Sequence, residues 1–552
     1  MLKTIFILVL QLLCGAAGSQ DLSIVPLPVS SKRGGGEFKL TRKTVIVAPD
    51  RNDKSTTAFL IQYIENVYGL RLNVVAKAST DFILIKTTTA KVPKDGYALL
   101  VKRESISIIG DSYAGTFWGM QTLIQLLEPY DFGSLFGKGN GISVSTLMVP
   151  AVLINDFPRF AYRGMHLDVS RHFFPVSFIK KYIDYIALHK MNFFHWHLTD
   201  DQGWRVKIKS FPLLTSVGGF RNGTIIGRYP GTSNDNQRYG GFYSQDEIRE
   251  VVRYATARHI TVVPEISMPG HSSAAIAAYP QLSCFPEEPT AKTRLTSKRS
   301  DSLRAKGKIK VVPETWGVFE DVLCAGKDST FIFLEGVLDE VLTLFPSKYI
   351  HIGGDEAPKG HWERCSKCKA RMKNEGLKNE AQLHTWFLKR IERYLAMRGR
   401  VSIRWDQKLE EDLGLESVVM SRSEAPIIMV AGKAPLLIMS PRQPLSFDHA
   451  QFKEKDSLAD NGFTPIEKVY AYEPAVGALN AGIALPVIGA QANVWTEYLK
   501  TPGKVEYMIL PRMSALSEVL WSPKASRSWK DFDRRLTSQA RRIILWKGSL
   551  NN

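Results

Sequence analysis

After its first 18 residues the sequence has no hydrophobic run long enough to cross a membrane, so we do not expect an integral membrane protein. Lys3, an apolar stretch over residues 4–13 and small residues up to Gly18 are typical of a secretory signal peptide. Cys14 would allow a lipid anchor, but Leu13 precedes it where a small residue is expected. We predict a signal peptide over residues 1–18, and an exported protein that is periplasmic or secreted and has no membrane span.

Cysteine is scarce, at five residues in 552, and four remain once the predicted signal peptide is removed. An even number in an exported protein suggests disulfides, and Cys284 with Cys324 would close a polar, basic loop. Cys365 and Cys368 form a CSKC motif. A zinc site would need a second ligand pair of suitable spacing, and none stands out. We therefore expect a local disulfide or two free thiols in this motif.

Acidic residues are outnumbered, because 54 Asp and Glu stand against 72 Lys and Arg and leave a net charge of +18. The basic residues are scattered over most of the chain, with one concentration over residues 292–310. Ser and Gly interleave that segment, so it is typical of a solvated loop and only weakly indicates a site for anionic glycans or nucleic acid. We predict no nucleic-acid partner.

A chain of 552 residues, 44% of them hydrophobic, predicts two folded units. Residues 19–155 combine short β-rich runs with helical stretches, which indicates a small α+β domain. That domain has no cluster of acids, histidines or cysteines, so its expected role is structural. Strands and helices alternate over residues 156–525, and residues 526–552 are expected to form a C-terminal helical tail.

Eight strand-like segments separated by crossovers predict an α/β fold, a (β/α)8 TIM barrel, over residues 156–525. The expected strands are residues 165–170, 193–201, 260–266, 349–356, 401–407, 417–421, 436–440 and 488–495. The clear helical stretches are residues 176–189, 245–259, 331–345 and 381–398. The helical signal is weakest between the sixth and eighth strands.

The segment KYIHIGGDEAP, residues 348–358, ends a predicted buried strand with two glycines and the adjacent carboxylates of Asp355 and Glu356. The carboxyl ends of barrel strands are where catalytic residues collect. Neighbouring strand residues point to opposite faces, but the glycines can break the pleat and let both acids line one cleft. The alternative is that both acids begin the next helix, since acids favour a first helical turn.

Other residues that can carry chemistry also fall at the ends of predicted strands, which favours the functional interpretation. They are Asp168, Arg171, His172, His195, His197, Asp200, Asp201, Glu265, His271, Trp405, Asp406, Trp495 and Glu497. Carboxylates beside tryptophans suit a carbohydrate site, because indoles stack on sugar rings while acids and arginine bond the hydroxyls. Core packing is the alternative for the tryptophans. Two neighbouring carboxylates could supply the proton donor and the charge stabilisation that glycoside cleavage needs.

His195 and His197 share one face of the second predicted strand and could bind a metal together with Asp200. A histidine near a carboxylate is more often part of a hydrogen-bond or proton network. We therefore predict no metal at this site, and the sequence does not argue for any cofactor.

Five motifs in this order resemble the family 20 glycoside hydrolases, the β-N-acetylhexosaminidases, in their bacterial secreted form. They are LDVSRHFFP, MNFFHWHLTDDQGW, ITVVPEISMPGH, KYIHIGGDE and GAQANVWTEY. The resemblance runs from about residue 22 to residue 523 and includes the small domain before the barrel. It implies a substrate-assisted retaining mechanism, in which the acetamido oxygen of the substrate attacks the anomeric carbon and gives an oxazolinium intermediate.

The resemblance also implies catalytic roles for four residues. Glu356 matches the general acid/base, and Asp355 matches the residue that orients the acetamido N–H and offsets the charge of the ring formed. Asp200 and His271 match the pair that supports the acid through hydrogen bonds.

Five further residues match the sugar-binding positions of the family. Arg171, Asp448 and Glu497 match ligands of the sugar hydroxyls, and Trp405 and Trp495 match the walls of the pocket. The implied partners are oligosaccharides or glycoconjugates that contain N-acetylhexosamine.

Three departures from the family pattern fall in one sector. The fifth strand usually ends GWDE and reads RWDQ here, at residues 404–407. Arg422 stands where an aromatic wall residue is typical, and Ser446 stands where a tyrosine bonds the acetamido oxygen. A serine hydroxyl reaches less far than a phenol, so the acetamido group would lose a positioning partner.

Three functions therefore stay open. The first is an exo-acting hexosaminidase that removes terminal N-acetylglucosamine or N-acetylgalactosamine. The second is a glycan-binding protein that has kept the fold and lost turnover. The third is an enzyme of the same mechanism that accepts a larger or anionic sugar, which Arg404 and Arg422 would favour if both point into the cleft.

Overall fold

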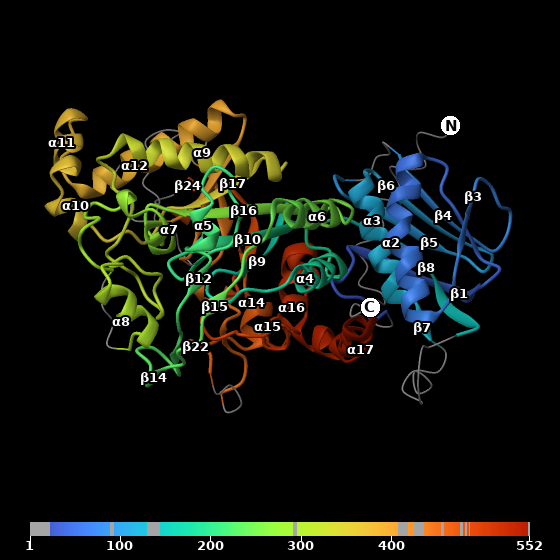
Figure 1. Ribbon diagram of the computed structural model, residues 1–552. Helices are drawn as coiled ribbons and strands as arrows, with labels where there is room; N and C mark the ends of the chain where they lie inside the picture. The colour runs from blue at the N-terminus through green and yellow to red at the C-terminus, as the bar shows by residue number, and fades with distance from the viewer. Residues whose placement is uncertain are drawn as a thin grey trace. The chain divides into compact units, whose positions relative to one another are not determined.

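The computed structural model describes residues 22–549 apart from residues 89–92, 130–143, 291–294, 407–417, 424–434, 454–457, 475–478, 481–482 and 485. The chain divides into two compact units, Met1–Pro158 with Trp521–Asn552, and Arg159–Leu520 (Figure 1). The predicted signal peptide lies outside the described residues. Among the helices described, none combines the length and hydrophobicity that a membrane span requires.

The first unit is built on an eight-stranded sheet with the order β1-β8-β5-β6-β4-β2-β3, and β7 pairs with β8. Its strands are β1 (Ser30–Thr41), β2 (Val45–Val47), β3 (Asn73–Val75), β4 (Phe82–Thr87), β5 (Tyr97–Val101), β6 (Ser105–Gly110), β7 (Glu128–Pro129) and β8 (Thr146–Asp156). Helices α2 (Arg51–Tyr68) and α3 (Tyr113–Leu126) pack together on this sheet (Figure 1). This is an α+β arrangement.

The C-terminal segment belongs to the first unit in space. It contains η4 (Lys524–Ser526) and α17 (Trp529–Ser549). Trp521 Nε1 donates a hydrogen bond to Asp156 Oδ1 at 2.9 Å, and Arg535 Nη1 donates one to the Ile24 carbonyl at 2.7 Å. Both donors are buried, so these bonds fix the C-terminal segment to the N-terminal part of the same unit.

The second unit is a closed barrel of eight parallel strands, which confirms the predicted fold class. The strands are β9 (Tyr162–Asp168), β10 (Phe193–Asp200), β16 (Thr261–Met268), β17 (Tyr349–Gly353), β18 (Val401–Trp405), β19 (Val418–Ser421), β20 (Leu436–Met439) and β25 (Val487–Ala492). Each of the eight expected strands is present. The barrel closes because β9 pairs with both β10 and β25. The strands are mostly apolar because both of their faces are buried.

Helices follow most barrel strands, as the four clear helical patterns predict. The helices between and after the strands are α4 (Val176–Leu188), α6 (Gln245–Thr256), α9 (Asp328–Leu344), α12 (Glu380–Met397), α15 (Pro502–Ile509) and α16 (Arg512–Trp521). Between β20 and β25 the only helices among the described residues are the short α13 (Arg442–Leu445) and α14 (Ile466–Ala471), in the region where the helical signal of the sequence is weakest.

The long loops of the barrel contain short elements. They are β11 (Gly203–Trp204), α5 (Leu213–Ser216), β12 (Phe220–Arg221), β13 (Ile225–Ile226), β14 (Ser233–Asn234), β15 (Tyr239–Gly240), α7 (Ser273–Ala278), η2 (Pro280–Leu282), α8 (Lys298–Ala305), α10 (Gly360–Arg364), α11 (Ser366–Asn374), β21 (His449–Ala450), β22 (Asp460–Phe463), β23 (Leu479–Asn480) and β24 (Ile483–Ala484).

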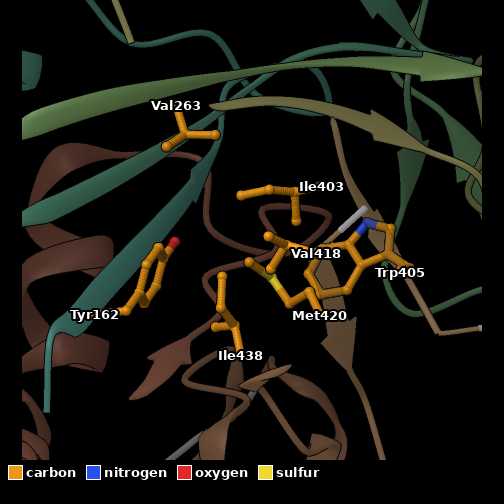
Figure 2. Packing of buried hydrophobic residues seen from close by; sticks show 7 residues of the cluster. All are labelled: Tyr162, Val263, Ile403, Trp405, Val418, Met420 and Ile438. Carbon is orange, nitrogen blue, oxygen red and sulfur yellow. The ribbon is translucent and has the colours of Figure 1, made fainter. Parts of the chain in front are cut away.

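Seven buried side chains fill the barrel interior (Figure 2). They are Tyr162, Val263, Ile403, Trp405, Val418, Met420 and Ile438, and each is at most 2% exposed. Burial of one such side chain contributes about 1.5–3 kcal/mol to stability. Trp405 ends β18, and Trp495 packs against the same cluster, so the core continues directly into the carboxyl end of the barrel.

The turn after β17 breaks the strand earlier than the sequence predicts. The expected strand runs to residue 356, but β17 ends at Gly353. Gly353 and Gly354 have φ of +68° and +89°, a left-handed conformation that side chains other than glycine rarely adopt. Asp355 and Glu356 follow in a loop, and the next helix begins only at Gly360. The alternative that both acids begin a helix is therefore wrong.

Candidate active site

A cavity of about 320 Å³ lies at the carboxyl ends of the barrel strands. All nine residues that the resemblance implies line it, namely Arg171, Asp200, His271, Asp355, Glu356, Trp405, Asp448, Trp495 and Glu497. Two adjacent acids reach one cavity because the strand ends before them and the two glycines redirect the backbone. The volume lies near the lower limit of small-molecule sites.

Glu356 is held by a histidine that is itself held by two aspartates. His271 Nε2 lies 3.3 Å from Glu356 Oε2, and His271 Nδ1 lies 3.0 Å from Asp201 Oδ2 and 3.2 Å from Asp200 Oδ1. Burial disfavours a charged His271, but the charge of Asp200 and these hydrogen bonds raise its pKa well above the usual value. His271 is therefore a cation that donates from both ring nitrogens.

The same contact acts on Glu356. The His271 hydrogen bond, helped by the positive charges of Arg422 and His271, outweighs partial burial and lowers the pKa of Glu356 to about 2. Its side chain keeps 45% of its surface exposed, so an incoming molecule can reach the carboxylate. In the free site the shared proton sits on His271.

Asp201 is a member of this network that the resemblance did not assign. Its second oxygen, Oδ1, accepts a hydrogen bond from the Ser273 backbone N–H at 2.9 Å, which orients the carboxylate toward His271. Asp200 serves other partners as well as His271. Its Oδ1 accepts a hydrogen bond from the Asp201 backbone N–H at 2.6 Å, and its Oδ2 lies 2.9 Å from both Arg171 and His197. The sequence signal was present, because two adjacent acids follow the second strand.

A buried chain of alternating charges runs behind the cavity. Arg171 Nη2 lies 2.9 Å from Asp200 Oδ2, which also lies 2.9 Å from His197 Nε2. His197 Nδ1 lies 2.6 Å from Glu265 Oε2. Burial alone would lower the pKa of His197, but the charge of Glu265 and the two hydrogen bonds raise it to about 10. Both ring nitrogens of His197 are thus directed at carboxylates, as the network interpretation expects.

Glu265 also positions one wall of the cavity, a role that the sequence did not reveal. Its Oε1 accepts a hydrogen bond from Trp405 Nε1 at 3.0 Å, and it is fully buried. The Trp405 and Trp495 rings lie 6.0 Å apart at 46°. Arg171 lies 5.2 Å from the Trp495 ring centroid, a cation–π distance. The two indoles offer apolar faces beside polar groups, which suits a sugar ring.

Asp448 and Glu497 supply carboxyl groups on the side formed by the last strands. Burial raises the pKa of Asp448 to about 6, and burial likewise raises the pKa of Glu497 to about 7. Among the described residues, Asp448 Oδ1 is a buried atom without a hydrogen-bond partner. A buried polar atom costs free energy until it is bonded, so this oxygen is ready to bind a hydroxyl group.

Of the residues that depart from the family pattern, Arg422 and Ser446 line the cavity, whereas Arg404 does not. Arg404 is 2% exposed and lies 3.4 Å from Glu392, away from the cavity. Arg422 lines the cavity, and its Nη1 lies 2.6 Å from Asp355 Oδ2. Ser446 is buried in the cavity wall. Of the two arginines that could point into the cleft, only Arg422 does so. Gln407 lies outside the described residues.

The cysteines do not form the expected disulfide. Cys284 and Cys324 are free, as are Cys365 and Cys368, and all four are buried. The four sulfur atoms lie within 4.8 Å of one another. The second ligand pair that the CSKC motif lacks in sequence is thus supplied by the fold.

Comparison with known families agrees with this geometry. The model of the glycosyl hydrolase family 20 catalytic domain matches residues 160–524, and the model of domain 2 of the same family matches residues 21–157. A beta-hexosaminidase of Porphyromonas gingivalis is 41% identical over 95% of this chain, which spans 63% of that relative's length. A beta-hexosaminidase of Vibrio furnissii is 34% identical over 91% of this chain and 77% of its own.

Solved structures give the same result. A GH20 exo-beta-N-acetylglucosaminidase from Vibrio harveyi, in complex with N-acetylglucosamine, matches with a TM-score of 0.79 at 29% identity, over 95% of this chain and 77% of its own. A beta-N-acetylhexosaminidase from Bacteroides fragilis matches with a TM-score of 0.74 at 30% identity, over 95% of this chain and 96% of its own. Because family models match both units and the site motifs line one cavity, the chain belongs to glycosyl hydrolase family 20.

Proposed function

We propose that the protein is an exo-acting β-N-acetylhexosaminidase that hydrolyses terminal N-acetylglucosamine or N-acetylgalactosamine from glycans. The observation that carries this proposal is the pairing of Glu356 with His271 beside Asp355 in one small cavity. The names of the relatives in P. gingivalis, V. furnissii and V. harveyi support the substrate class. The leader-like residues 1–18 support the further proposal that it acts outside the cytoplasm.

The proposed reaction is substrate-assisted. The acetamido oxygen of the bound sugar attacks the anomeric carbon, the glycosidic C–O bond breaks, and Glu356 gives its proton to the leaving oxygen. Asp355 accepts a hydrogen bond from the acetamido N–H and stabilises the positive charge of the oxazolinium ring. Glu356 then takes a proton from water as that water attacks the anomeric carbon, so the enzyme returns to its first state and the configuration is retained.

The His271 contact explains how Glu356 can act as an acid although its pKa is low in the free site. His271 holds the proton on Nε2, 3.3 Å from Glu356 Oε2. A sugar that fills the cavity removes water from Glu356, and loss of hydration favours the neutral form of a carboxyl group. The proton can then move from His271 to Glu356 and on to the glycosidic oxygen, while Asp200 and Asp201 stabilise the histidine.

The remaining groups fix the sugar. Arg171 presents a planar set of donors and is held in place by Asp200, so little freedom is lost when a hydroxyl binds. Asp448 and Glu497 lie in the loops that follow β20 and β25, and at mildly acidic pH each carboxyl group can both donate and accept a hydrogen bond. Trp405 and Trp495 bound the apolar face of the ring.

The decisive experiment is turnover of a chromogenic N-acetyl-β-glucosaminide and of its galacto epimer by the mature protein. We expect hydrolysis of at least one substrate, with loss of activity in Asp355→Asn. Binding of one sugar without hydrolysis would instead favour the glycan-binding protein that has lost turnover. If the protein neither binds nor hydrolyses either sugar, the proposal is contradicted.

A second candidate function follows from Arg422, which places a guanidinium group in the cavity where the family has an aromatic residue. Its side chain is 32% exposed, so it can meet a substrate while it holds Asp355. The candidate is the same reaction on a sugar with an anionic substituent. A higher kcat/KM on a sulfated N-acetyl-β-glucosaminide than on the neutral one, with the preference lost in Arg422→Gln, would favour it.

A further inference from the structure

Four cysteines from three separate segments meet in the loops beside the barrel mouth. Cys284 follows η2, Cys324 precedes α9, Cys365 is the N-cap of α11 and Cys368 lies in the first turn of that helix. All four are buried, at no more than 8% exposure. The mechanism proposed above uses none of them, and none lines the cavity. The fold has therefore collected the four cysteines of residues 22–549 in one place.

Their spacing is that of a tetrahedral thiolate site. The Sγ–Sγ distances are 3.7 Å for Cys284 and Cys368, 3.7 Å for Cys324 and Cys368, and 3.9 Å for Cys324 and Cys365. Zinc binds thiolates at about 2.3 Å, so the corners of a tetrahedral ZnS4 site lie about 3.8 Å apart. A disulfide requires about 2.05 Å. One central ion can reach all four sulfur atoms.

The local backbone also suits a metal site. Cys365 and Cys368 have the C-x2-C spacing of zinc sites, at the N-terminus of α11, where the helix dipole favours negative charge. The backbone N–H of Gly326 acts electrostatically on the sulfur of Cys324, two residues earlier. A Cβ on Gly326 would lie 2.2 Å from the Lys367 carbonyl carbon, so the two cysteine-bearing turns pack backbone to backbone.

We propose that Cys284, Cys324, Cys365 and Cys368 bind one structural zinc ion. The ion displaces four protons from the thiols and leaves a Zn(S-Cys)4 unit of charge −2. Lys327 and Arg364 lie close enough to act electrostatically on Cys324 and Cys284, and they offset part of that charge. Four soft thiolates in a closed tetrahedron select zinc over the hard cations Mg²⁺ and Ca²⁺. A site with no open position is structural rather than catalytic.

The ion would join the loops that carry His271 and Glu356. The Leu323 N–H donates to the Pro269 carbonyl at 2.9 Å, two residues before His271. Trp362 lies six residues after Glu356, and its Nε1 donates a hydrogen bond to the Leu323 carbonyl at 3.1 Å. A Cβ on Gly270 would lie 1.8 Å from the Glu356 carbonyl oxygen, so these two loops touch. The zinc site therefore acts as a positioning element for the acid and its histidine.

The test is metal analysis of the full protein, exported by its host and purified without reductant or chelator. We expect inductively coupled plasma mass spectrometry to find one zinc ion per chain. After denaturation with a chelator and no reductant, all four cysteines should react with iodoacetamide. Four unreactive cysteines would indicate two disulfides and overturn the proposal, and four reactive cysteines without metal would overturn it as well.

Variants make the test specific. Cys365→Ser with Cys368→Ser should remove the zinc, whereas Ser366→Ala, an exposed residue of the same CSKC segment, should retain it. Removal of zinc from the wild type should lower the Tm by roughly 5 °C or more, because the ion binds the folded state. Full zinc content in the double cysteine variant would contradict the assignment. If that variant does not fold, the wild-type metal content and thiol reactivity still decide.

Discussion

At the scale of single residues, the chemistry depends on where one proton resides. Glu356 is ionised in the free site because His271 donates to it, and His271 is cationic because Asp200 and Asp201 both accept from it. A carboxylate alone could not protonate a glycosidic oxygen. The acid is therefore the pair of Glu356 with His271, and the aspartates keep that pair charged.

The first prediction concerns Glu356. Glu356→Gln keeps the shape of the side chain but cannot give or take the proton, so kcat should fall about 100- to 10,000-fold with the fold intact. Glu363→Gln, which changes an exposed residue seven positions later, is the matched control and should keep full activity. The measurement is turnover of the chromogenic substrate, with circular dichroism to check the fold. Activity of Glu356→Gln close to that of the wild type would remove Glu356 from the acid role.

The second prediction concerns Ser446, which lies in the cavity wall where the family has a tyrosine. Ser446→Tyr should raise kcat/KM on N-acetyl substrates about 10-fold or more, because a phenol can reach and orient the acetamido oxygen that acts as nucleophile. The gain should be absent on a substrate whose acetamido group is replaced by a hydroxyl. An unchanged or lower rate would mean that Ser446 does not occupy the tyrosine position.

At the scale of elements, the turn after β17 decides whether two adjacent acids can share one cavity. Gly353 and Gly354 both have positive φ, and a Cβ on Gly354 would lie 3.3 Å from Leu388. The strand therefore ends in a conformation that only glycine adopts without strain. The loop that follows carries the catalytic pair directly, since Asp355 comes immediately after Gly354.

The third prediction tests this turn. Gly354→Ala should cost about 1 kcal/mol of stability through backbone strain and should lower kcat at least 10-fold, because the shift reaches Asp355 and Glu356. Gly399→Ala is the control, since Gly399 has φ of +69° and open space around it, far along the chain from the site. It should lose similar stability and keep its activity. Equal activity in both variants would show that the turn does not position the acids.

The elements also show what the sequence could predict. Eight strands and the acids at their ends were readable, because a strand buried on both faces is a short apolar run and a catalytic carboxyl group interrupts it. Glu265 was not recognised as the support of Trp405, since a buried hydrogen bond of this kind depends on partners from other strands. The cysteine cluster was missed for the same reason, because Cys284 and Cys324 reach the CSKC motif only through the fold.

At the scale of the whole molecule, buried acids give the stability a definite pH dependence. Burial raises the pKa of Asp448 to about 6, although His449 and Arg512 oppose the shift and Asp460 adds to it. The folded protein therefore prefers protonated Asp448, whereas the unfolded chain loses this proton near pH 4. Stability from this group is fully present below pH 4 and is lost as the pH rises through 6.

The fourth prediction follows from that sign. Between pH 4 and pH 6.5 the Tm of Asp448→Asn should rise relative to that of the wild type, by an amount that corresponds to roughly 1–3 kcal/mol at the upper end. Glu356 and His197 are unchanged in the variant, so their own contributions are common to both proteins and do not cause the divergence. Glu497, whose pKa the charge of Asp448 helps to raise, adds to the divergence in the same direction. Asp246→Asn, which removes an exposed carboxylate, should show no such divergence. Parallel Tm curves for the wild type and Asp448→Asn in differential scanning calorimetry would mean that Asp448 is ionised throughout. It would then bind the sugar as an acceptor only, and its unpartnered Oδ1 would be bonded by water in the free site.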